Sequence, residues 1–111
     1  MTTDMRIVEF RQPVAAATAP VEASKVLAGT PVATVANHYS DPGARFHCGT
    51  WSSTPGRWRV HYTEHEFCHL LAGRVRLCGD DGSVREFVAG DAWVIPGGHA
   101  GKWGTLEAAA K

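Results

Sequence analysis

The chain has 111 residues, with 11 basic and 11 acidic side chains and a formal net charge of zero. A chain of this length folds as one domain around one core, and its even charge without a basic block argues against a nucleic-acid partner. No apolar run approaches the roughly 20 residues that span a bilayer, and residues 1–10 lack a signal-peptide core, so we expect no membrane partner and a cytoplasmic location. The three cysteines include no CxxC pair, which argues against a disulfide framework and a structural zinc site.

Residues 1–29 are predicted to form an N-terminal arm, ahead of a β-domain over residues 30–111. The arm combines an extended candidate at 6–10, an Ala/Pro-rich segment between Pro13 and Pro20, and a helical turn at 24–27. The two prolines exclude a continuous helix through this part. We expect no chemistry in the arm.

From residue 32 onward, short strand candidates alternate with turn signals rich in Gly, Pro and Asp. The predicted strands cover residues 32–35, 45–51, 57–62, 66–72, 74–78, 83–88, 92–95 and 101–105. This spacing, without a long helical period, predicts an all-β antiparallel sandwich or barrel.

The stretch 56–73 concentrates polar side chains able to do metal or acid/base chemistry. Two alternating strands flank a turn at 63–65, and Cys68 falls on the same strand face as Glu66. This pattern predicts a β-lined pocket with carboxylate and imidazole groups near its mouth. The four side chains concerned are His61, Glu64, His65 and Glu66.

Two spacings in the sequence resemble the cupin motifs. Glu66, six residues and then Gly73 resembles the closing half of the first motif, and Gly90 through Pro96 to Gly98 resembles the second. The chain is similar to small RmlC-like cupins related to ureidoglycine aminohydrolases and to ethanolamine-utilisation cupins, from about residue 49 onward. The resemblance implies an antiparallel double-stranded β-helix, the jelly-roll cupin barrel.

The resemblance also implies a metal site, which in cupins uses two histidines one residue apart, a glutamate and a third histidine. Only His61 and Glu66 match, because the other positions fall on Arg59 and Gly101. In a shorter register the histidine pair falls on Val60 and Tyr62. Two protein ligands leave most coordination positions to water. A divalent transition metal (Mn, Fe, Ni or Zn) and no metal at all both remain open. Further candidate ligands near the same rim are Glu64, His65 and His99.

The predicted pocket has five candidate substrate-binding residues. A strand arginine facing inward would bind a small carboxylate or ureido group by bidentate hydrogen bonds, and one facing outward would be an ordinary surface residue. Two tryptophans near the strand ends are expected as walls, although large aromatic residues in small β-domains usually belong to the core. The candidates are Arg59, Tyr62, Cys68, Trp51 and Trp103.

Two functions remain open for this small-molecule-binding pocket. In the first, His61 and Glu66 are catalytic and use a metal to activate water or polarise a small nitrogen- or carboxylate-containing metabolite, as the resemblance implies. In the second, the cavity holds a ligand without turnover and the metal site is degenerate. A homodimer is also expected, because the resembled proteins continue past Lys111 into a further strand and an uncovered strand edge favours association.

Overall fold

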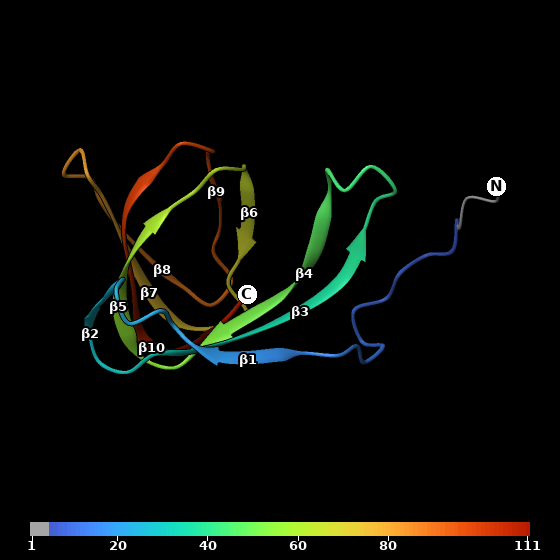
Figure 1. The fold of residues 1–111 in the computed structure, drawn as a ribbon, viewed down its shortest axis with the longest axis horizontal. Helices are drawn as coiled ribbons and strands as arrows, with labels where there is room; N and C mark the ends of the chain where they lie inside the picture. The colour runs from blue at the N-terminus through green and yellow to red at the C-terminus, as the bar shows by residue number, and fades with distance from the viewer. Residues whose placement is uncertain (1–4) are drawn as a thin grey trace.

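The computed structural model describes residues 5–111, and every regular element in that range is a β-strand (Figure 1). Since residues 5–111 contain no helix, none of them forms a helix that could cross a membrane. The all-β prediction is confirmed. The strands are β1 (Ala17–Pro20), β2 (Val26–Ala28), β3 (Val32–Ser40), β4 (His47–Ser53), β5 (Gly56–His61), β6 (Glu66–His69), β7 (Ala72–Gly79), β8 (Val84–Val88), β9 (Ala92–Ile95) and β10 (Ala100–Ala110).

Eight strands form one strongly curled antiparallel sheet, and β6 and β9 form a separate two-stranded sheet. The longest strand, β10, organises the large sheet, because one of its edges pairs first with β5 and then with β4 while the other pairs with β7. The resulting half-barrel is that of a cupin jelly roll. In Figure 1 the β3–β4 hairpin extends away from the half-barrel and the C-terminus lies close to β6.

The core fills the space between the two sheets and is built around three tryptophans. Trp58 and Trp103 are paired in register on β5 and β10, with ring centroids 6.4 Å apart, and Trp51 packs 5.2 Å from Trp103. The indole N–H of Trp103 donates to Thr105 Oγ1 at 3.0 Å, and that hydroxyl also meets Ser53 Oγ at 2.6 Å. The buried polar atoms of this cluster are thus paired, as a dry core requires.

The glycine of the first motif-like spacing lets β7 pass close to β10. Gly73 has a φ of +86°, and a Cβ at this position would lie 2.2 Å from the carbonyl oxygen of Ala108. Any other residue would combine a left-handed backbone with a backbone clash. The spacing from Glu66 to Gly73 therefore reflects the step from the small sheet into the large one.

Several element boundaries differ from the predicted ones: β3 runs on to Ser40 and β4 ends at Ser53, beyond the predicted ends at residues 35 and 51. Residues 6–10 form no strand, whereas β1 and β2, within the stretch expected as an arm, pair with β3 and β5. The break expected at Gly73 falls at Leu70, because buried Leu70 leaves the small sheet and its N–H donates to Asp91 O. The last strand extends beyond Thr105 to Ala110, because β4 and β7 continue to pair with it.

Candidate functional site

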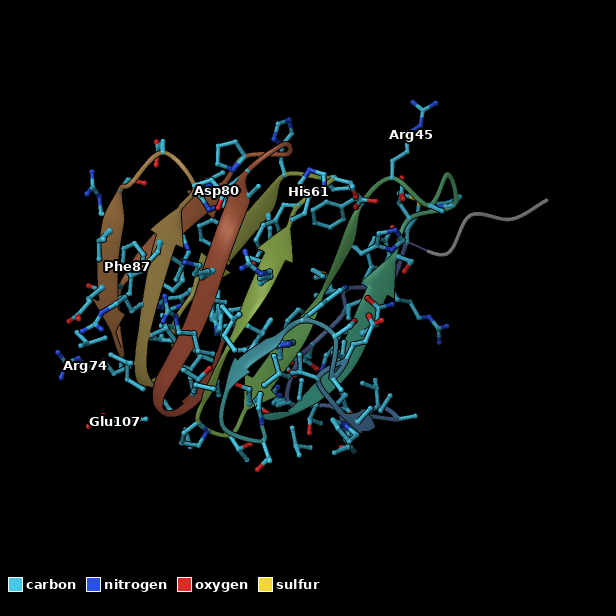
Figure 2. The ribbon with its side chains drawn as sticks, turned by 60° about the vertical axis from the view of Figure 1, so that its left-hand side comes forward. Arg45, His61, Arg74, Asp80, Phe87 and Glu107 are labelled. Atoms are coloured by element: carbon cyan, nitrogen blue, oxygen red, sulfur yellow. The ribbon has the colours of Figure 1, made fainter. Side chains whose placement is uncertain are left out.

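A cleft of about 1070 Å³ opens between the β3–β4 hairpin and the small β6–β9 sheet. The loop after β5 closes one end of the cleft, and Figure 2 shows His61 on β5 and Arg45 on the β3–β4 loop at the same end of the molecule. The outward face of β6 is open, with Phe67 72% exposed.

An ion pair between Lys111 and Glu66 occupies the wall of the cleft. Lys111 Nζ donates to Glu66 Oε2 at 2.7 Å, and the thiol of Cys68 donates to the same oxygen at 3.1 Å. The ammonium lies 5.1 Å from the ring centroid of Trp51 and 5.8 Å from that of Trp103, within cation–π range. Lys111 is the more enclosed partner, with 13% of its side chain exposed against 38% for Glu66.

The backbone places this lysine independently of its side chain. Trp51 N–H donates to Lys111 O and Lys111 N–H donates to Trp51 O, both at 2.8 Å, which continues the β4–β10 pairing. Glu66 begins β6, and its alternation with buried Cys68 turns the carboxylate inward. The two charges therefore come from different sheets and meet across the cleft.

Two neutral side chains line the wall beside the ion pair. Burial raises the pKa of the Cys68 thiol to about 12; the Lys111 ammonium opposes this and the Glu66 carboxylate adds to it. Burial also raises the pKa of Tyr62 above its usual range, with Glu66 and Cys68 adding to the effect. Near neutral pH these two groups therefore act as hydrogen-bonding groups and not as anions.

Most of the predicted site residues come together in this cleft. His61 and Glu64 are exposed at its rim, and His61 forms no hydrogen bond with Glu66 in the part of the chain that the structure describes. The predicted residues that line the cleft are Trp51, His61, Tyr62, Glu64, His65, Glu66 and Cys68.

Three other predicted residues are placed outside the cleft. Arg59 is exposed on the outer side of β5, because buried Trp58 sets the inward register of that strand. Trp103 is only 2% exposed and stands behind Trp51 as a core residue. His99 packs against Tyr62, with ring centroids 6.2 Å apart, and does not line the cleft.

Comparison with known families assigns this architecture. The EutQ-like cupin domain matches residues 40–111, well over half of the chain. The chain belongs to that family. No curated protein matches the sequence of this EutQ-like cupin.

Several solved structures share the fold. A DUF861 family protein from Pseudomonas syringae is 24% identical with a TM-score of 0.77, over 87% of this chain and 42% of that one. A DUF861 family protein from Thermotoga maritima is 26% identical with a TM-score of 0.54, over 55% of this chain and 69% of that one. The EutQ protein of Clostridium difficile is 16% identical with a TM-score of 0.64, over 72% of this chain and 64% of that one. This EutQ-like cupin thus spans less than half of the Pseudomonas protein.

The side chains of this EutQ-like cupin do not fit the metal that cupins commonly hold. His65 Nδ1 accepts the N–H of Gly97 at 3.0 Å, so in neutral His65 the proton is on Nε2 and neither nitrogen offers a free lone pair. One oxygen of Glu66 already accepts the Lys111 ammonium. Among residues 5–111, no three His, Cys, Asp or Glu side chains gather closely enough to hold a metal ion.

Lys111 is the site residue that sequence reasoning missed. Its partner Glu66 is 45 positions away, so no helix or strand periodicity relates the two. A lysine that follows the apolar run 108–110 is the one local signal, because a lysine there must either reach solvent or find a carboxylate.

Proposed function

We propose that this cleft binds a small polar molecule that carries an N–H donor beside a carbonyl or carboxylate oxygen. The Lys111–Glu66 ion pair carries the proposal, because it places a donor and an acceptor side by side on one wall. Among the described residues, Glu66 Oε1 accepts no hydrogen bond, and one of the three ammonium donors of Lys111 is used by Glu66. A ligand N–H would meet Oε1 while the ligand oxygen meets Lys111.

The rest of the wall suits an amide, a ureido group or an amino acid. Trp51 offers a planar apolar surface, and the neutral Tyr62 hydroxyl offers a further hydrogen bond, whereas the Cys68 thiol already donates to Glu66. A cleft of about 1070 Å³ lies at the upper end of the range for small-molecule sites. The ligand class agrees with the ureido substrate that resemblance to ureidoglycine aminohydrolases implies.

Binding without turnover is better supported than metal-dependent catalysis. The catalytic hypothesis needs His61 and Glu66 on one ion, but His61 stands at the rim and Glu66 is held by an ammonium. A divalent cation at Glu66 would also lie close to the Lys111 charge, which disfavours it electrostatically. We therefore derive no reaction step through a metal.

Calorimetric titration with small probes tests this function. N-carbamoylglycine and glycinamide carry the N–H donor and the oxygen, whereas methoxyacetate carries the oxygen without any hydrogen-bond donor. We expect the first two to bind and methoxyacetate to bind at least about tenfold more weakly, since each charge-assisted hydrogen bond is worth about 1.5 to 3 kcal/mol. Glu66→Gln should remove that preference. Glu64→Gln should keep it, because Glu64 lines the same cleft and forms no ion pair with any of residues 5–111.

Two results would contradict the proposal. One is equal affinity for all three probes, and the other is an equal effect of the Glu66 and Glu64 substitutions. Elemental analysis after metal loading separates the alternative function, because a stoichiometric transition metal lost in Glu66→Gln would favour the metal-dependent enzyme over the binding protein.

We also propose that the protein forms a homodimer in which a strand edge or the N-terminal segment reaches the partner. Apolar side chains around the cleft are left open, with Phe46 59%, Phe67 72% and Val94 59% exposed. In addition, β1 pairs only with β3 among the described strands, so its outer edge is free to associate. Light scattering at high micromolar concentration should give the dimer mass, and a monomer mass would contradict the proposal.

A further inference from the structure

A second, smaller groove of about 410 Å³ lies on the outer face of the large sheet, where β7, β10 and β5 run side by side (Figure 2). It is separated from the cleft by the sheet itself, because Trp103 faces the core while Lys102 and Gly104 face outward. The groove is lined by Ala28, Gly56, Arg57, Arg76, Cys78, Lys102, Gly104, Thr105 and Leu106.

The groove concentrates positive charge on a chain with no net charge. Three of its lining residues are cationic and none is acidic. Arg57 and Lys102 form no ion pair within residues 5–111, and Arg59 beside them forms none either. Arg76 is held by Glu86, whose carboxylate also accepts Arg74. The cations inside the groove therefore exceed their acidic partners.

The strand register places two of these cationic residues on opposite sides of the groove. Gly104 on β10 is paired with Arg57 on one side and Arg76 on the other, so the two arginine Cα atoms lie about two strand spacings, or roughly 10 Å, apart. Because Gly104 has no side chain, the space between the two arginines stays open. Lys102 lies two residues before Gly104 on the same strand and faces the same side.

We infer that this groove is a binding site for a phosphate group, either free or carried by a small phosphorylated molecule. The guanidinium of Arg57, the ammonium of Lys102 and the Nη1 group of Arg76, which does not contact Glu86, surround an open floor and match the several acceptor oxygens of a phosphate. Ala28 and Leu106 add an apolar border against which the organic part of a phosphate ester would pack. The size of the groove suits a small molecule.

Calorimetry with inorganic phosphate and with phenyl phosphate tests the site. We expect Arg57→Gln to weaken the binding of both probes by at least about tenfold, as loss of a charge-assisted contact should. The matched control is Arg85→Gln, which removes the same charge from β8 outside the groove and should change affinity less than about twofold.

A variant that fills the groove distinguishes phosphate binding inside the groove from non-specific attraction to its positive charges. A Cβ at Gly104 would make ordinary contacts, 3.5 Å from Arg76 O and 3.9 Å from Leu106, so Gly104→Leu should fold while filling the floor between the arginines. We expect it to abolish phosphate binding with all cations retained. A thermal melt of this variant in phosphate-free buffer checks that it has folded.

The measured affinities either identify the ligand class of the groove or overturn the site. Tighter binding of phenyl phosphate identifies an ester as the ligand class, and equal binding identifies free phosphate; both support the site. Equal losses in Arg57→Gln and Arg85→Gln, or unchanged binding in folded Gly104→Leu, would overturn it. Amide chemical-shift changes confined to the Trp51 and Lys111 cleft on phosphate addition would overturn it as well.

Discussion

The Lys111→Met substitution tests how the cleft is held together. It keeps the length and most of the apolar contact of the side chain while removing the ammonium that pairs with Glu66 and lies over Trp51. Among residues 5–111, the carboxylate then keeps only the weak thiol donor of Cys68. We therefore expect loss of stability together with loss of ligand binding.

The size of the effect follows from the exposure of the two partners. An exposed pair is worth about 0 to 1 kcal/mol, and removing one partner of a buried pair costs about 3 to 5 kcal/mol. Lys111 is 13% exposed and Glu66 38%, which places the pair between these limits. Loss of the contact with Trp51 adds about 0.5 to 1 kcal/mol. We expect Lys111→Met to lower the free energy of unfolding by about 2 kcal/mol, or the melting temperature by roughly 8 to 9 °C for a domain of this size.

A double-mutant cycle isolates the pair. Urea unfolding of the parent, Lys111→Met, Glu66→Gln and the double variant should give a coupling free energy of about 1 to 2 kcal/mol. Glu66→Gln alone should cost less than Lys111→Met, because an amide oxygen can still accept from the ammonium. Additive effects, with coupling below about 0.3 kcal/mol, would refute the ion pair as an organising contact.

Three further outcomes test other parts of the structure. Because the pKa of Cys68 is raised to about 12, iodoacetamide at pH 8 should modify Cys48 and Cys78 before Cys68. Peptide mass spectrometry can follow the modification, and early modification of Cys68 would contradict its burial. In urea unfolding, Gly73→Ala should lower the free energy of unfolding by more than about 4 kcal/mol. Gly82→Ala should lower it by about 1 to 2 kcal/mol, because Gly82 has a similar φ but open space around it. Equal losses would show that close packing against Ala108 does not set the requirement for glycine at position 73. Hydrogen bonds from Arg74 and, to a smaller extent, Arg76 lower the pKa of Glu86. The ionised carboxylate therefore stabilises the fold at pH values above its ordinary pKa, and this stabilisation is lost as the pH falls through the lowered value. Glu86→Gln should make the free energy of unfolding depend less on pH in this acidic range.

The local pattern of the chain determined its fold class. Strand-length segments punctuated by Gly, Pro and Asp specify short strands and tight turns, because these residues set the backbone angles that turns require. β9 (Ala92–Ile95) falls where the alternation predicted it, and Glu66 and Cys68 share the inward face of β6 as their spacing indicates. Motif spacing was informative because Gly73 has a φ of +86°, a local backbone requirement that favours glycine.

Tertiary structure alone decided which residues share a site. Strand alternation leaves open which of the two faces is inward, and for Arg59 that choice was made by Trp58 packing against the core. The pairing of Lys111 with Glu66 depends on how β10 continues past β5 onto β4 and on where the small sheet lies. Long-range contacts of this kind arise from the packing of whole sheets, and residue order along one strand carries no trace of them.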